Sequence, residues 1–434
     1  MSRSKPQPAT RLRRGDLLPS TGAGRRRGRL AAVHQRRARR YETPGLAPPA
    51  DSQNPVWVEA LGSNVLTDDG RRYIDLTSGF GVATIGHRHP AVVAAIRRQS
   101  ARLIHGLGDA QSHPLRSELA AALLRRAPIA GGRVAFAISG ADAVELAVKS
   151  ALLATGRSRI VAFEPSYHGL TLGALALSSR AHFRRDFRAH LHRQLIRLPY
   201  GCAMSELRAA LTGGNIAAIV VEPIVGREGI VLPPAGWLAE LGTLARHAGA
   251  LVIDDEILTG GGRTGRWFAA SGEALEPDLI CCGKGLAGGM PWAAVIGREE
   301  VMNAWDRPGE ARHTATFVAQ PLACAAALAT LGVLSRERLI RRAQAIGRRL
   351  ESALAGWPRR LEAVRSVRGR GALWGIEWQQ PEQAAHFSRR LGRRGLLVLN
   401  GGSEARVTQL LPPLVITPRQ LDYVVDCLSA AARE

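Results

Sequence analysis

The sequence predicts an α/β fold with a mostly parallel central sheet and helices on both of its faces. Between about residues 132 and 297, short apolar runs alternate with helical segments; the runs are RVAFAIS, RIVAFEP, IAAIVVEP, ALVIDDE, DLICCGK and WAAVIG. Strands that are apolar throughout are buried on both faces, as in a parallel sheet. With 434 residues and 46% hydrophobic content, the chain can bury a large core, and we expect two domains or one elaborated domain.

The segment before this sheet predicts part of a smaller α+β domain. Residues 57–79 alternate apolar and polar positions around an Asp-Gly turn, which favours a β-hairpin. Amphipathic helices are expected at 90–103 and 114–127.

The segment after the sheet completes that smaller domain. The chain is expected to be helical from Pro321 to about residue 357, and Thr417 followed by Pro418 is typical of the start of a final helix. The expected divisions are a basic, disordered tail at 1–45, a small-domain segment at 46–104, a large domain at 105–325 and a second small-domain segment at 326–434.

The net charge of +23 is concentrated at the N-terminus. Residues 1–40 contain thirteen Lys or Arg and one Asp. Such a tail could bind nucleic acid or act as an organelle presequence. However, no aromatic residue that could stack on bases lies among the arginines before Tyr41. We therefore favour a disordered extension in an arginine-biased sequence and expect no nucleic-acid partner.

The rest of the composition favours a cytoplasmic protein. No apolar stretch is long enough to span a bilayer, and no apolar segment follows the basic N-terminus as in a secretory signal. The cysteines lack metal-ligand spacing and are expected to be buried thiols. They are Cys202, Cys281, Cys282, Cys324 and Cys427. We expect neither a metal site nor a membrane partner.

Polar residues follow the carboxyl ends of several expected strands. They are Ser139-Gly140, Tyr167-His168, Glu222, Asp255 and Lys284. In α/β sheets, ligands bind beyond the carboxyl ends of the strands. The sequence therefore predicts that these residues converge on one binding site.

Two glycine-rich stretches near this edge do not fit nucleotide-binding motifs. GGGRTG at 260–265 has the GxGxxG spacing, but no helical pattern follows it. Lys284 is not a P-loop lysine, because Gly285 replaces the Ser or Thr and Asp278 stands where the first glycine should be. We expect ordinary glycine loops at both places.

Lys284 is one of only three lysines, with Lys5 and Lys149, in a chain that has 59 Lys and Arg residues. Arginine stays protonated and cannot form an imine, whereas a desolvated lysine loses its proton more readily and becomes a nucleophile. Lys5 lies in the tail, and an ion pair in an expected helix would explain Lys149. Lys284 is therefore the candidate for a Schiff base with an aldehyde cofactor.

Such a cofactor also needs a carboxylate, a phosphate site and a flat ring partner. Asp255 is placed to keep a ring nitrogen protonated, although either of its acidic neighbours could be confused with it. Gly140 and Ala141 open an expected helix whose first N–H groups can bind a phosphate. Tyr167 is available to cover the ring.

With these residues in place, residues 55–434 resemble the class III aminotransferases, which are pyridoxal-phosphate (PLP) enzymes of fold type I. The resemblance rests on motifs in the family order. They are YIDLTSGFGVATIGHRHPAVVAAI, SGADAVELAVK, YHG, VVEPIVGREGI, LVIDDEILTGGGRTG, PDLICCGKGLAGGMP, TATFVAQPLACAAALATL, RGRGALWGIE and LLPPLVIT.

The resemblance implies a role for each matching residue. Lys284 would form the Schiff base with PLP, and Asp255 would pair with the pyridine nitrogen. Gly140 and Ala141 would donate to the phosphate, and Tyr167 would cover the ring.

It also implies a homodimer with its sites at the interface, because Thr316 would reach the phosphate of the neighbouring subunit. His168 and Glu222 would take supporting places beside the cofactor. The freed Lys284 would act as general base while an amino group moves from an amino acid or ω-amine donor to a 2-oxo acid or aldehyde acceptor.

Three positions depart from the family pattern. Leu258 replaces a Gln beside the cofactor's phenolic oxygen, and Gln409 replaces an Arg that grips a substrate carboxylate. Arg227 stands where many relatives carry a Glu that shields that Arg. We expect carboxylate recognition to move to Arg227, with Arg406 as a second candidate, or one substrate to lack an α-carboxylate. A solvated surface arginine is the other interpretation of Arg227.

Two other functions remain open at this point. A racemase or aminomutase of the same fold family would use the same lysine and aspartate. A nucleic-acid-associated protein would act through the tail, but it would leave the residues at the sheet edge unexplained.

Overall fold

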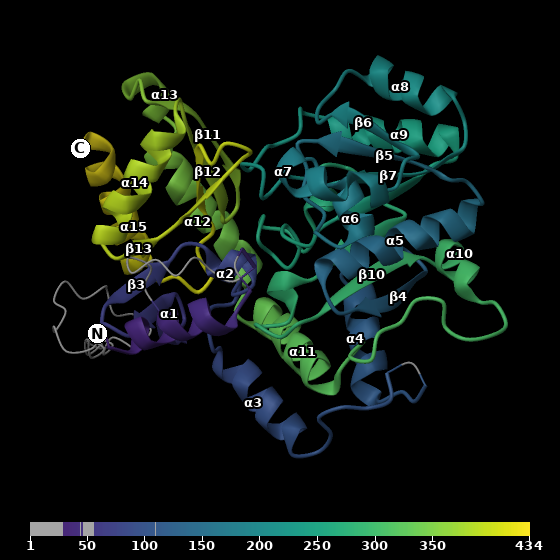
Figure 1. Ribbon diagram of the computed structural model, residues 1–434, viewed down its shortest axis with the longest axis horizontal. Coiled ribbons are helices and arrows are strands. Elements are labelled where there is room, and N and C mark those ends of the chain that lie inside the picture. Colours follow the sequence, from purple (N-terminus) through teal and green to yellow (C-terminus); the bar gives the residue numbers. More distant parts are fainter. Residues whose placement is uncertain (1–28, 44, 47–55, 109) are drawn as a thin grey trace, which may run out of the picture.

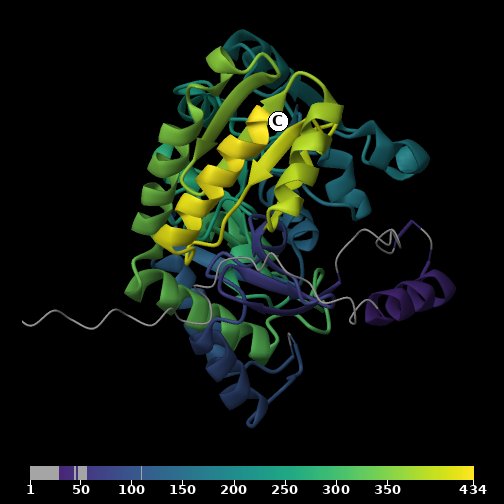
Figure 2. The same ribbon diagram turned by 90° about the vertical axis from the view of Figure 1, so that its left-hand side faces the viewer.

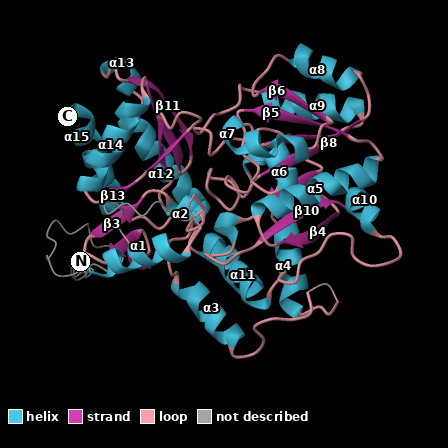
Figure 3. Ribbon diagram, in the orientation of Figure 1, coloured by secondary structure: helices cyan, strands magenta, loops and turns pink. Residues whose placement is uncertain are grey.

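The computed structural model describes residues 29–43, 45–46, 56–108 and 110–434. Their strands form three sheets with helices packed around them (Figures 1 and 3).

The central sheet has seven strands in the order β4-β10-β9-β8-β7-β5-β6. Their bounds are β4 Gly132–Ala137, β5 Arg159–Glu164, β6 Leu195–Pro199, β7 Ile216–Val221, β8 Leu251–Asp255, β9 Leu279–Cys282 and β10 Ala293–Arg298. The strands β6, β5, β7, β8 and β9 pair in parallel, and β10 is antiparallel to both of its neighbours. The expected mostly parallel sheet is confirmed. β6 was not expected from the sequence.

Helices cover both faces of this sheet because its strands are apolar on both sides. Ala218 and Val220 of β7 pack in one core with helix α5 (Gly140–Thr155), whereas Ile219 and Val221 pack in another with α8 (Met204–Thr212) and α9 (Trp237–Ala248). Shorter helices on this part of the chain are α6 Leu172–Leu177, α7 Ala181–Arg184 and α10 Glu299–Met302, with 3-10 turns η2 Arg185–His190, η3 Ala269–Gly272, η4 Lys284–Leu286 and η5 Asn303–Trp305.

Two smaller sheets are built from the ends of the chain. One has the order β1-β2-β3-β13 and joins β1 Trp57–Leu61, β2 Asn64–Thr67 and β3 Arg72–Asp75 to the distant β13 Leu396–Leu397. The other has the order β11-β12-β15-β14, with β11 Val364–Arg370, β12 Leu373–Trp378, β14 Leu399–Gly401 and β15 Val407–Leu410. The expected hairpin at 57–79 is confirmed, because β2 and β3 pair antiparallel across the turn. The domain boundaries near 104 and 325 stay a prediction.

Helices of the two ends pack together into the largest apolar core. They are α3 Pro90–Ser100, α4 Pro114–Leu124, α11 Pro321–Arg336, α12 Leu339–Leu354, α13 Trp357–Arg360, α14 Pro381–Arg393 and α15 Pro418–Arg433. The short helix α2 (Ser78–Gly81) lies between β3 and α3 in the chain. The final helix begins as expected, with Thr417 Oγ1 accepting from Gln420 N and Pro418 in the first turn. α3 and α4 each end about three residues before the expected bounds.

Part of the segment that was expected to be a disordered tail is helical. Residues 29–41 form helix α1 (Arg29–Tyr41), which Figure 2 shows projecting away from the rest of the described chain. Residues 1–28 lie outside the described residues.

All five cysteines are buried and free, as expected. In the part of the chain that the structure describes, no helix is long and apolar enough to cross a membrane. The same residues contain no group of three or more His, Cys, Asp or Glu side chains that could hold a metal ion.

Candidate active site

The carboxyl ends of β4, β5, β7, β8 and β9 lie at one edge of the central sheet. β5, β7, β8 and β9 are parallel, and β4 shares their direction because β10 is antiparallel to both β4 and β9. Asp255 pairs in register with Cys281, three residues before Lys284. The chain direction thus brings the predicted polar residues to one edge.

Asp255 and His168 form a buried ion pair at this edge. The Nδ1 atom of His168 lies 2.7 Å from Oδ2 of Asp255, and Oδ1 of Asp255 accepts from the backbone N–H of Ile257 at 3.1 Å. Burial by itself would lower the pKa of His168, but the hydrogen bond to Asp255 and the charges of Asp255 and Glu222 outweigh it and raise the pKa. Asp255 is therefore held as an oriented carboxylate. Its neighbours Asp254 and Glu256, which the sequence could not separate from it, make no contact with His168 that the structure records.

Lys284 begins the turn η4 directly after β9, with a φ of 34°. Burial lowers the pKa of Lys284, and the positive charge of Arg227 acts in the same direction, while Asp255 and Glu222 oppose them. The neutral, nucleophilic amine is therefore more accessible here than at an ordinary lysine. A Cβ atom at Gly285 would collide with Oγ1 of Thr84, so close packing explains this glycine.

The start of α5 provides unpaired backbone donors at the same edge. Oγ of Ser139 accepts from the N–H of Asp142 at 3.2 Å, which leaves the N–H groups of Gly140 and Ala141 at the first helical positions. A Cβ atom at Gly169 would collide with Ala141, so the Tyr-His-Gly turn packs directly on this helix start. The arrangement suits an anion such as a phosphate.

Glu222 holds two loops in place with its carboxylate. Its oxygens accept from the backbone N–H of Tyr167 and of Gly226, each at 2.9 Å. Burial raises the pKa of Glu222 to about 7, against the opposing charge of His168. Glu222 thus orients Tyr167 and the loop that carries Arg227.

A cavity of about 380 Å³ opens beside Lys284 between the large sheet and the C-terminal strands. Its lining residues are Thr77, Phe80, Tyr167, Arg180, Arg227, Leu258, Lys284, Leu399, Asn400, Gly401, Gln409 and Leu411. Leu258 packs so closely against Gly81 and Gly226 that a Cβ atom at either glycine would collide with it. The cavity wall is therefore apolar where the family pattern has a Gln.

Arg227 and Gln409 both line the cavity, but only Arg227 offers a charge to it. The guanidinium carbon of Arg227 lies 4.4 Å from the ring centre of Tyr167 and 5.4 Å from that of Phe183. Nε2 of Gln409 donates to the backbone oxygen of Gly226 at 3.0 Å. Gln409 therefore supports the loop, and Arg227 is the better-placed carboxylate ligand.

Two predicted site residues lie elsewhere. Arg406 is not among the cavity residues; its guanidinium pairs with Glu404 and donates to the backbone oxygen of Gln379. The hypothesis that Arg406 replaces the missing arginine is therefore not supported, because its charge is already paired outside the cavity. Thr316 is exposed and also does not line this cavity.

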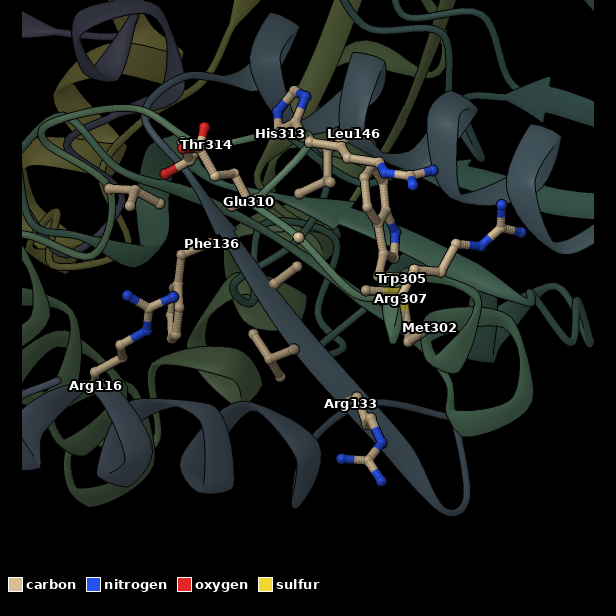
Figure 4. A pocket seen from close by; sticks show the side chains of 16 residues that line it. Arg116, Arg133, Phe136, Leu146, Met302, Trp305, Arg307, Glu310, His313 and Thr314 are labelled. Carbon is tan, nitrogen blue, oxygen red and sulfur yellow. The ribbon is translucent and has the colours of Figure 1, made fainter. Parts of the chain in front are cut away.

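A second cavity, of about 460 Å³, is lined by Thr314 and Val318, which flank Thr316 in the chain, but not by Thr316 itself (Figure 4). This cavity lies between β4 and the loop 307–314, and its labelled side chains include Arg116, Phe136, Trp305 and His313. No residue of the sheet edge lines it. Its larger volume therefore does not make it the candidate active site.

A family model described as aminotransferase class-III matches residues 47–432. The chain belongs to the class III aminotransferase family. The enzyme is 39% identical over 378 residues to the acetylornithine aminotransferase of Methanosarcina acetivorans, a match that covers 86% of the enzyme and 91% of that relative. The acetylornithine aminotransferase of Methanopyrus kandleri is 38% identical, with 87% and 94% covered.

The solved structures show the same fold. The ornithine aminotransferase from Toxoplasma gondii matches with a TM-score of 0.84 at 29% identity, covering 93% of the enzyme and 95% of that chain. A second structure of that protein, at 30% identity and a TM-score of 0.82, has partial occupancy of PLP at its active site; that match covers 91% of the enzyme and 92% of that chain. The enzyme is thus a PLP-dependent aminotransferase of fold type I, as the sequence predicted.

The residues at the sheet edge fit this cofactor. An amine of lowered pKa, an oriented carboxylate and a helix start with unpaired N–H groups follow neighbouring strands. Nε2 of His168 is buried without a hydrogen-bond partner among the described residues.

Sequence reasoning missed two charged residues of the cavity region. Arg180 lines the cavity, and the buried Glu228 forms an ion pair with it. Neither residue follows a strand end, and Arg180 is one of many arginines. Only the position of Glu228, next to Arg227 in the motif VVEPIVGREGI, could have drawn attention to it.

Proposed function

We propose that the enzyme moves an amino group between a carboxylate-bearing amine and a carbonyl acceptor in the 380 Å³ cavity, with Lys284 as the covalent attachment point of PLP. The observation that carries the proposal is the position of Lys284. It is the only lysine among the cavity residues, and its pKa is lowered by burial.

Three groups would hold the cofactor. Asp255, fixed by His168, would keep the ring nitrogen protonated. The N–H groups of Gly140 and Ala141 would bind the phosphate. When bound, PLP supplies an aldehyde carbon that takes the amino group and a ring that withdraws electrons from the substrate carbon beside the nitrogen.

The chain's own residues then move one proton. Nζ of Lys284, once released from the cofactor by the donor amine, would accept the proton from the substrate carbon beside the nitrogen and would deliver it to the cofactor's aldehyde carbon and not back to the substrate. Burial lowers the pKa of Lys284 and so favours the neutral amine that this transfer needs. Leu258 and Leu411 form an apolar wall beside this amine and limit the access of water.

Arg227 is proposed to bind the substrate carboxylate. Its side chain lies on Tyr167, lines the cavity, and is close enough to Lys284 for its charge to influence the pKa of the amine. The names of the relatives make acetylornithine and ornithine the first donors to test.

We further propose a cytoplasmic homodimer in which Thr316 reaches the phosphate in the neighbouring subunit. The exposure of Thr316, outside the cavity of its own chain, supports this assignment. Phe317, next to it, is also exposed at 64%, as expected of an apolar side chain that a partner covers.

The donor half-reaction tests the proposal. Wild-type enzyme given a donor without any acceptor should lose the visible absorption of its bound cofactor and release one carbonyl product. Lys284→Arg keeps the charge but loses the amine, so this rate should fall by about 10²- to 10⁴-fold. Lys149→Arg, in α5 and outside the cavity, is the matched control and should react normally.

Two results would overturn the proposal. One is an unchanged half-reaction in Lys284→Arg. The other is inversion of a single enantiomer without loss of its amino group, which would instead identify a racemase.

A further inference from the structure

The cavity contains a second arginine whose charge is already used. Nε of Arg180 lies 2.7 Å from Oε1 and 2.9 Å from Oε2 of Glu228, and its Nη2 donates to the backbone oxygen of Gly402 at 2.7 Å. The side chain of Glu228 is 1% exposed, and that of Arg180 is 21% exposed. A carboxylate this deeply buried beside a substrate cavity is costly unless it is paired.

The two cavity arginines therefore differ in what they offer a substrate. Arg180 and Glu228 together are neutral, and Glu228 would repel a second anion placed beside Arg180. Arg227 packs on aromatic rings, and the structure records no ion pair between it and any described carboxylate. Apart from Lys284, Arg227 is then the one net positive charge among the described cavity residues.

Apart from Lys284, no other cavity residue that the structure describes carries a positive charge for a second carboxylate. Leu258, Leu399 and Leu411 are apolar, and Nε2 of Gln409 is used by the backbone. An aliphatic chain that leads away from Arg227 would thus meet apolar surface or the neutral pair.

We propose that Glu228 is a specificity-determining residue: by neutralising Arg180, it makes the cavity select acceptors with one carboxylate over acceptors with two. The proposal deepens the function proposed above and rests on it. It predicts that the preferred acceptor is a monocarboxylic 2-oxo acid with an apolar end.

A matched pair of acceptors tests this in the wild-type holoenzyme. The acids 2-oxopentanoate and 2-oxopentanedioate have the same chain length and differ only in a terminal methyl group or carboxylate. With the donor held constant, kcat/KM should be at least about tenfold higher for 2-oxopentanoate. The second carboxylate of 2-oxopentanedioate would meet apolar side chains or the neutral Arg180–Glu228 pair, in which Glu228 repels it.

Glu228→Gln identifies the residue responsible. It releases the charge of Arg180, so kcat/KM for 2-oxopentanedioate should rise by about tenfold while that for 2-oxopentanoate stays constant. In the double variant Arg180→Met with Glu228→Gln this gain should disappear, because no cation remains to be released. In Glu228→Gln the guanidinium of Arg180 is left without its partner, which could destabilise the fold. The double variant removes that guanidinium as well, so it can still be measured if Glu228→Gln folds poorly.

Each outcome of these experiments supports or overturns the inference. In the wild type, equal kcat/KM values for the two acceptors, or any preference for 2-oxopentanedioate, overturn the inference alone. So does a variant series in which both acceptors change by the same factor, which is the result expected if the ion pair only supports the fold. Absence of the donor half-reaction overturns the proposed function and this inference with it.

Discussion

Replacing Arg227 by Met distinguishes two roles of this residue: a ligand of the substrate carboxylate and a solvated surface arginine. Methionine keeps the aliphatic contact with Tyr167 and Phe183 but removes the guanidinium that lies 4.4 Å from the Tyr167 ring. If Arg227 binds the substrate carboxylate, only substrates that carry one should suffer.

The expected size follows from where Arg227 lies. A hydrogen-bonded pair of guanidinium and carboxylate contributes about 1.5–3 kcal/mol when desolvated. Arg227 is exposed at the cavity mouth, so water screens part of its attraction for a carboxylate. The lower end of this range, about 1.5 kcal/mol, therefore applies. A loss of about 1.5 kcal/mol corresponds to a roughly tenfold lower kcat/KM.

The assay is steady-state kinetics with two donors of equal length, an ω-amino acid and the amine that lacks its carboxylate. In Arg227→Met, kcat/KM should fall about tenfold for the acid and stay within about twofold for the amine. Arg227→Lys should recover part of the loss, since lysine keeps the charge but not the planar fork.

Arg406→Met is the matched control. Arg406 is paired with Glu404 outside the cavity, so its loss should change neither donor. If the ratio of kcat/KM for the acid to kcat/KM for the amine is the same in wild type and in Arg227→Met, the reasoning is refuted. A loss for the acid alone in Arg406→Met would show that Arg406 binds the carboxylate instead.

Three further outcomes are expected. Thr316→Val should raise the dissociation constant of PLP by about tenfold, the loss of one hydrogen bond to a phosphate, as measured by equilibrium dialysis; unchanged retention would argue against its role in the neighbouring site. Arg263→Met should lower the free energy of unfolding by about 3–5 kcal/mol, because the buried guanidinium binds Ala372, Pro412, Ser78 and Thr84; a thermal midpoint equal to that of the wild type would contradict this. Burial, followed by the charges of Glu256 and Asp255, raises the pKa of Asp254 well above its ordinary value. The folded enzyme therefore holds the Asp254 proton to a higher pH than the unfolded chain, which loses it above about pH 4, and the free energy of unfolding falls as the pH rises through this range. Asp254→Asn removes this dependence, so its free energy of unfolding, from urea titrations, should fall less steeply as the pH rises above about 5, by up to about 1.4 kcal/mol per pH unit; parallel curves would show that the pKa of Asp254 is not raised in the folded enzyme.

Local patterns were enough to predict much of the large domain. Buried strands are uniformly apolar, so the runs ending at Ala137, Val221 and Cys282 were visible without a structure. β6 escaped because Arg197 interrupts its short apolar run and pairs with Glu164 of the neighbouring strand. The direction of β10 also had no local signal, since a buried strand has the same pattern in both directions.

The site divides in the same way. The position of Lys284 and Asp255 at one edge of the sheet could be predicted because both follow strand ends; their roles as amine nucleophile and ring carboxylate stay a proposal. The sequence by itself thus determined the fold class and the cofactor chemistry, and it favoured aminotransfer while a racemase or aminomutase stayed open.

Only the tertiary structure decided which arginines are available to a substrate. Glu228 follows Arg180 by 48 positions and meets it only when β5 and β7 pair, while Arg406, close to the departure at Gln409, is taken by Glu404. Residue type determines what charge a side chain can carry, but whether that charge is free depends on which partner lies within a few ångströms. In a chain this rich in arginine, the number of arginines does not show which of them can meet an anionic substrate. That depends on which guanidinium groups are already paired with a carboxylate of the chain.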